Sequence, residues 1–238
     1  MIFLYKRNLE TASSLSSLDI APVSDINNLY DTRLSSYALF VPGDNTVEIS
    51  IEFPAALPFD TIGLGGHSFG EGTTISVNGG EAFAVSQRHA VVNVGVDVQS
   101  VINLLITDPT LPPGNPRYIG RLEIGEGYKT PDISSQVKLD NVSNSESILS
   151  TSRQSYGYRK APYSRSSFQF PYITTDERRV MGEFFQYVDV FVPFFVGMDE
   201  DCIEVFDNYA ILEETQTLSF QLSDAMHYTS SLTISEVY

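Results

Sequence analysis

The chain has 238 residues with 42% hydrophobic content, and it contains 15 Phe and 13 Tyr but no Trp. This content is enough for packed cores and excludes wholesale disorder, and the length allows one large β domain or two smaller ones, of which we expect two. A formal net charge of -16 opposes binding to nucleic acid or to a membrane surface, because those partners require a cationic protein face.

The chain begins with a short apolar run that precedes a basic pair, in MIFLYKRNLE. A secretion signal has the opposite order, and no later stretch reaches the length of a membrane span. We therefore expect a protein that is made in the cytoplasm and has no membrane partner.

The front half contains four segments in which apolar and polar residues alternate with period two. These predicted strands cover residues 47–53, 73–78, 101–108 and 120–126. In the first, Val47, Ile49 and Ile51 share one face, as expected for a half-buried antiparallel strand. Asn78 and Gly79 tolerate the positive φ of a hairpin turn, so a chain reversal is predicted there.

A glycine-rich run, GLGGHSFGEG, covers residues 63–72. It lacks the Gly-Lys-Ser/Thr ending of a phosphate-binding loop and is followed by a strand, whereas such loops open a helix. The run also fails to match the G-x-S-x-G turn of serine hydrolases, because Ser68 is one position away from the place of the nucleophile. We interpret the run as a tight connection between strands.

A Ser- and Asn-rich stretch, residues 136–155, predicts a linker or a long exposed crossing. A basic, tyrosine-rich segment follows at 152–165. Its residue types are those of protein interfaces, and the alternative is a loop whose charges are merely solvated. The candidate interface residues are Arg153, Tyr156, Tyr158, Arg159, Lys160, Tyr163 and Arg165. The acidic surface of another copy of the chain would complement them.

One helix is predicted after Pro171. Thr174 or Thr175 is a suitable N-cap, and Glu177 completes a capping box with Thr174. An apolar stripe then indicates packing on a sheet and comprises Val180, Met181, Phe184, Phe185 and Val188. Candidate strands for that sheet are 191–196, 209–212, 217–222 and 231–238. The fold class is therefore mainly β, with two β-sandwich domains and one helix on the second: 1–140, an arm at 141–165, and 166–238.

Catalytic and metal-binding patterns are missing from the sequence. His67, His89 and His227 have no metal-ligand spacing, so we expect them to be structural or exposed. The acidic cluster at 199–201 lacks the ligand spacing of a calcium loop and is interpreted as a solvated turn. Cys202 cannot form an internal disulfide and is expected to be a buried thiol. We therefore expect no catalytic site, bound metal or cofactor. A third hypothesis is a hydrolase with scattered catalytic carboxylates, and this function would require a cleft.

Several motifs, in their order, resemble tail proteins of long-tailed bacteriophages. In the front half these are NLYDTRLSSYA (28–38), the stretch from VEISIEF to TTISV (47–77), and YIGRLEIGEGYKTP (118–131). In the back half they are SSFQFPYITTDERRVMGEFFQYV (166–188), PFFVGMD (193–199) and YTSSLTISEV (228–237). The resemblance implies a galactose-binding-like sandwich followed by a domain similar to tail-tube and distal-tail proteins. Distal-tail proteins usually place these two domains in the opposite order.

The resemblance implies a noncatalytic structural protein of the virion, at the tail tip or baseplate. Its partners would be tube, hub or distal-tail proteins and copies of itself. The alternative is a carbohydrate-binding module for host surface glycans, which predicts exposed aromatic platforms in the loops of residues 30–120. The absence of Trp disfavours this alternative.

Overall fold

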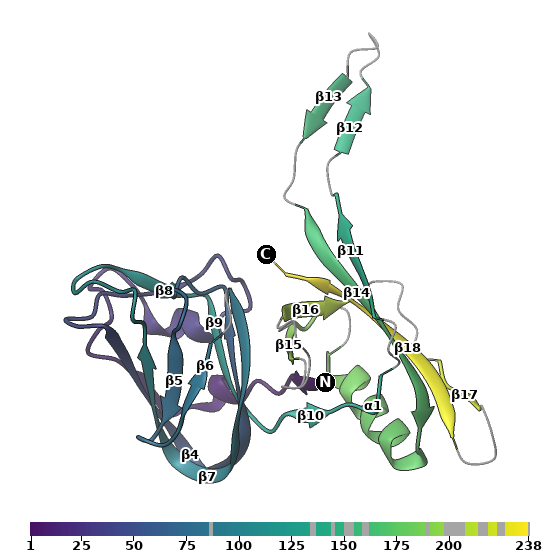
Figure 1. The fold of residues 1–238 in the computed structure, drawn as a ribbon, viewed down its shortest axis with the longest axis horizontal. Coiled ribbons are helices and arrows are strands. Elements are labelled where there is room, and N and C mark those ends of the chain that lie inside the picture. The colour runs from purple at the N-terminus through teal and green to yellow at the C-terminus, as the bar shows by residue number, and fades with distance from the viewer. Residues whose placement is uncertain are drawn as a thin grey trace. The chain divides into compact units, whose positions relative to one another are not determined.

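A computed structural model describes residues 1–85, 88–133, 137–143, 146–149, 155–158, 162–188, 191–197, 208–213, 219–222 and 227–237, with 146–149 and 155–158 as backbone only. The described residues are mainly β, with antiparallel sheets and one α-helix, as predicted (Figure 1). It forms two compact units. Unit 1 comprises residues 1–130 and 193–209, and unit 2 comprises 131–192 and 210–237. The predicted domain boundaries at 140 and 165 stay a prediction.

Unit 1 contains a β-sandwich. One sheet has the order β2-β4-β7-β5-β6, and β9 pairs with β4. A second sheet pairs β3 with β8. The bounds are β2 (Ser14–Ser16), β3 (Ala38–Phe40), β4 (Thr46–Gly65), β5 (Thr74–Val77), β6 (Ala82–Ala84), β7 (His89–Thr107), β8 (Arg117–Ile119) and β9 (Arg121–Gly125), with 3-10 helices η1 (Asn8–Thr11) and η2 (Ile26–Tyr30).

The four strands predicted in the front half are confirmed, and two of them are longer than predicted. The predicted 47–53 is the start of the 20-residue β4, and 101–108 is the end of the 19-residue β7. Their pairing shifts register between Glu52 and Leu57 and again between Phe59 and Thr61. Such shifts bend a strand pair. Residues of both halves of β4, such as Ile49 and Leu64, consequently lie in one core.

The predicted turns are also confirmed. Asn78 and Gly79 have φ values of 50° and 72° and connect β5 to β6. The glycine-rich run ends β4 and forms the connection to β5, with Gly66 and Gly72 at positive φ. Gly70 lies so close to Thr110 that an added Cβ would collide with that side chain. Glycine is therefore explained at these positions by the positive φ or by the lack of space for a side chain.

A buried ion pair fastens both 3-10 helices to β9. The Arg121 guanidinium contacts the Glu123 carboxylate at 2.8 Å, and both side chains are 3% exposed. Glu123 accepts a hydrogen bond from the Leu9 amide of η1 at 2.9 Å, and Arg121 donates to the Tyr30 carbonyl of η2. Hydrogen bonds from both partners to backbone compensate part of the desolvation of the charges.

Unit 1 also includes three strands from distant parts of the sequence. β1 (Ile2–Leu4) pairs antiparallel with both β10 (Tyr128–Lys129) and β15 (Phe194–Gly197). Phe195 of β15 is 1% exposed, and its ring lies against Gly63 of β4, where an added Cβ would be 2.5 Å from the ring carbon Cδ2. The segment 193–209 therefore supplies core residues to unit 1.

Unit 2 is built on antiparallel strands. Its strands follow the order β16-β18-β14-β11, and β17 also pairs with β18. A separate two-stranded hairpin pairs β12 with β13. The bounds are β11 (Lys138–Val142), β12 (Glu146–Leu149), β13 (Ser155–Tyr158), β14 (Tyr163–Ile173), β16 (Asn208–Leu212), β17 (Gln221–Leu222) and β18 (Tyr228–Glu236).

The single predicted helix is α1 (Thr175–Val188). Thr174 is the cap: its amide donates to the Glu177 carboxylate at 2.7 Å, and its hydroxyl oxygen accepts from the Glu177 amide at 3.3 Å. Met181, Phe184 and Val188 of the predicted stripe are buried. The Arg178 guanidinium lies 4.8 Å from the ring centre of Tyr228, so the helix contacts β18. No helix within the described ranges is long and apolar enough to span a membrane.

Candidate functional site

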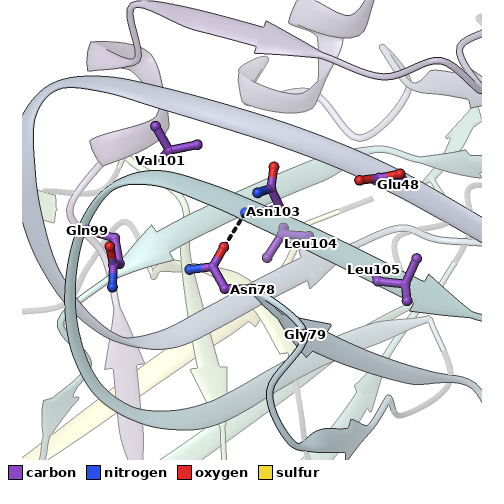
Figure 2. Close-up of a pocket in the computed structure, with 8 residues that line it drawn as sticks. All are labelled: Glu48, Asn78, Gly79, Gln99, Val101, Asn103, Leu104 and Leu105. Atoms are coloured by element: carbon purple, nitrogen blue, oxygen red, sulfur yellow. Dashed lines mark hydrogen bonds between the residues drawn. The ribbon is translucent and has the colours of Figure 1, made fainter.

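Unit 1 has a groove of about 630 Å³ on the outer face of the β2-β4-β7-β5-β6 sheet. Figure 2 shows the side chains that border it, which come from β4, β7 and the turn after β5. The lining residues are Glu48, Asn78, Gly79, Gln99, Val101, Asn103, Leu104 and Leu105.

The alternation of the two long strands explains why polar groups face this groove. On β7, Ile102, Leu104 and Ile106 are fully buried, so Asn103 and Leu105 between them face outward. The register places Glu48 of β4 directly opposite Leu105. Hydrogen bonding within the sheet therefore fixes which side chains meet at the surface.

The turn between β5 and β6 forms one border of the groove and is tied to β7. The side-chain oxygen of Asn78 accepts a hydrogen bond from the Asn103 amide at 2.8 Å, the dashed line in Figure 2. The Asn78 amide donates to the Asn103 carbonyl, also at 2.8 Å. Asn78 is thus a structural member of the border, while the amide groups of Asn103 and Gln99 are presented at the surface.

The groove offers mainly uncharged hydrogen-bonding groups. Its lining contains three side-chain amides and one carboxylate, from Glu48, and it contains no Lys, Arg, His, Cys or Ser. Gln99 additionally donates to Asp97 at 3.2 Å. Side-chain amides both donate and accept hydrogen bonds, which suits a ligand rich in hydroxyl groups.

Unit 1 also carries an exposed aromatic pair, with one ring before a strand and one on a strand, whereas the carbohydrate-binding alternative predicts aromatic platforms in the loops of residues 30–120. Tyr37 precedes β3 and is 47% exposed, and Tyr118 of β8 is 42% exposed. Their ring centres lie 5.2 Å apart with an interplanar angle of 44°. Tyr118 is opposite Leu39 in the β3-β8 register. This surface belongs to a different sheet from the groove.

A buried carboxylate organises the loops beside the aromatic pair. Asp108 accepts hydrogen bonds from the amides of Gly70 and Thr110, from the Thr110 hydroxyl, and from Arg117 at 2.9 Å. Burial by itself would raise the pKa of Asp108. The hydrogen bonds from Thr110, Arg117 and Gly70 outweigh this effect and lower the pKa to about 2. Asp108 is therefore a structural anion.

The predicted interface residues fall on β13, on β14 and outside the described residues. Arg165 on β14 donates to Glu213 at 2.8 Å and lies 3.7 Å from Asp140, and the hydrogen bond to Glu213 raises the pKa of Arg165. Tyr163 is half-buried on the same strand. Tyr156 and Tyr158 belong to β13. Arg153, Arg159 and Lys160 lie outside the described residues. The assignment of an interface to these residues stays a prediction.

The three histidines are divided between the two units. His67 and His89 belong to unit 1, and His227 belongs to unit 2. In the part of the chain that the structure describes, no group of three or more His, Cys, Asp or Glu side chains could hold a metal ion. The predicted acidic turn at 199–201 and the predicted buried thiol of Cys202 lie outside the described residues.

Sequence reasoning missed the groove, although part of its signal was present. The alternation at 47–53 placed Glu48 on the face opposite to Val47 and Ile49. The 101–108 segment was predicted as a strand, but no face was assigned to Asn103 and Leu105. The pairing that brings Asn78 beside Asn103 joins residues 25 positions apart and is not encoded in a local pattern.

Several solved structures resemble part of this chain. A chitosan-binding module from a Paenibacillus sp. IK-5 chitosanase/glucanase has 10% identity and a TM-score of 0.37, covering 47% of this chain and 92% of the module. A Streptococcus pneumoniae fucose-binding module has 11% identity and a TM-score of 0.35, covering 47% and 89%. A Ruminococcus gnavus fucosidase in complex with fucose has 12% identity and a TM-score of 0.36, covering 52% of this chain and 26% of the enzyme.

No protein-family model and no curated protein matches the sequence. The structural neighbours named above include carbohydrate-binding modules, and each covers about half of this chain. The resemblance to bacteriophage tail proteins stays a prediction.

Proposed function

We propose that unit 1 is a noncatalytic carbohydrate-binding module that holds a glycan in the groove between Glu48, the Asn78 turn and Asn103. The observation that carries the proposal is the groove itself, a concave sheet face bordered by three side-chain amides. Ligand sites combine apolar surface with a few well-placed polar groups. Here Val101 and Leu105 supply the apolar surface, and Gln99 and Asn103 supply donors and acceptors for sugar hydroxyls.

The proposal is tested by screening the full chain on a glycan array and measuring affinity for any hit by calorimetry. Removing a neutral hydrogen bond costs about 0.5–1.5 kcal/mol. Gln99→Ala and Asn103→Ala should therefore each weaken binding by about two- to tenfold. Asn115→Ala removes an amide from an exposed loop that does not line the groove, and it should leave the affinity unchanged.

Two outcomes would contradict this assignment. An array without hits would remove the carbohydrate-binding function from unit 1. Loss of binding in Tyr118→Ala, together with unchanged binding in Gln99→Ala and Asn103→Ala, would move the glycan from the groove to the aromatic pair.

A second candidate function is the virion structural role implied by the sequence resemblance. The observation that favours it is the hairpin of β12 and β13, which pairs only with itself among the described strands. An isolated two-stranded hairpin is marginally stable in water, so a neighbouring tail protein or a second copy would stabilise it. Mass spectrometry of purified phage particles tests this role, and absence of the chain from the particle would exclude it.

A further inference from the structure

We infer that the groove selects glycans by charge and favours sugars that carry a free, protonated amine. The inference rests on the proposed function and adds a ligand class to the same groove. It concerns the Glu48 carboxylate, the only charged group among the lining residues.

The position of Glu48 leaves its carboxylate available to a ligand. Both polar backbone groups of Glu48 form hydrogen bonds. The amide donates to the Asp19 carboxylate at 3.0 Å, and the carbonyl accepts from the Ser17 hydroxyl. Within the described residues, no hydrogen bond or ion pair engages the carboxylate itself. Glu52 on the same outward face differs, because its carboxylate accepts a hydrogen bond from the Ser14 hydroxyl at 3.2 Å.

The only charge among the lining residues of the groove is negative. The lining contains no Lys or Arg, and the Asp19 carboxylate lies beside the backbone of Glu48. The whole chain carries a net charge of -16. An anionic glycan would be repelled, whereas a protonated amine would meet a complementary potential. The amides of Gln99 and Asn103 can meanwhile bind hydroxyl groups that neutral and amine-bearing sugars share.

The size of the expected preference follows from the exposure of the site. Ion pairs at exposed sites contribute little, because water and salt screen them. We therefore expect about a two- to fivefold preference for the amine-bearing sugar at low salt, and a smaller preference at high salt.

The test compares two oligosaccharides of equal length, a glucosamine hexamer and an N-acetylglucosamine hexamer, at a mildly acidic pH where the free amines are protonated. Calorimetry with the full chain should show the two- to fivefold preference for the glucosamine hexamer. Glu48→Gln should abolish the preference, so that the two hexamers bind with equal affinity. Glu71→Gln makes the same charge change at an exposed residue that does not line the groove, and it should retain the preference.

The outcomes separate this inference from the proposed function. Equal affinity of the normal chain for both hexamers would overturn the inference and leave glycan binding intact. A preference that persists in Glu48→Gln, or that disappears equally in Glu71→Gln, would show nonspecific attraction to the acidic chain and would also overturn it. Failure to bind either hexamer, with a neutral glycan bound from the array, overturns the inference alone. Failure to bind any glycan overturns both.

Discussion

Asp108 is the residue whose substitution is expected to have a clear pH signature. Its folded-state pKa of about 2 lies below the ordinary aspartate value of about 3.9. The stability it contributes is therefore present above about pH 4 and is lost as the pH falls toward 2. Hydrogen bonds to charged groups contribute about 1.5–3 kcal/mol, so Asp108→Asn should cost about that much at neutral pH.

Urea unfolding at a series of pH values measures this effect. The stability difference between the normal chain and Asp108→Asn should shrink as the pH falls from about 4 to 2. Asp44→Asn is a useful control, because Asp44 also accepts a hydrogen bond from a nearby amide, that of Thr46, but is exposed. A difference that does not depend on pH would show that Asp108 is not ionised in the folded chain.

At the residue scale, sequence reasoning succeeded where local backbone chemistry decides the structure. Asn78-Gly79 predicted the turn because few residue types tolerate positive φ. The capping box of Thr174 and Glu177 was equally local. The role of Asp108 could not be predicted, because its partners at positions 70, 110 and 117 meet only after three segments have folded together.

At the scale of elements, the ion pair on β9 should control the docking of η1 and η2. Removing one partner of a buried ion pair costs about 3–5 kcal/mol, because the other charge stays buried and unpaired. Arg121→Met and Glu123→Leu should each destabilise unit 1 by about that amount. The double variant should cost far less than the sum of the two, since it leaves no uncompensated charge.

A double-mutant cycle measured by denaturant unfolding tests this coupling. The exposed pair of Arg33 and Asp31, at 2.7 Å, provides the control, and Arg33→Met should have little effect. Additive effects of Arg121→Met and Glu123→Leu would contradict the description of the pair as the common anchor of both 3-10 helices.

The lengths of β4 and β7 show why elements were predicted only in part. The alternation of 47–53 is followed by Pro54 and Pro58, and proline interrupts a β ladder because it lacks an amide hydrogen. The structure continues β4 through this region by shifting register, so the prolines mark a bend where the sequence indicated an end. Tertiary pairing with β7 and β9 supplies the continuation, and no local pattern carries that information.

At the scale of the whole molecule, the sequence predicted a mainly β chain with one helix but could not predict how segments are shared between units. The two compact units interleave along the sequence. Residues 193–209 belong to unit 1 although they follow most of unit 2. The sequence predicted a strand in this segment but not the unit that it joins. That choice depends on the steric fit of the Phe195 ring against Gly63, about 130 positions away in the sequence.

This interleaving makes a prediction about the stability of unit 1. Phe195 fills space against Gly63 and lies 4.8 Å, between ring centres, from Tyr209. Replacing a buried Phe by Ala costs about 3–5 kcal/mol. Phe195→Ala should therefore lower the protection of the β4 and β9 amides in hydrogen exchange by about that amount. Phe191→Ala removes the same ring from a residue that is 80% exposed and should change little. Equal protection in both variants would show that the Phe195 ring does not stabilise unit 1.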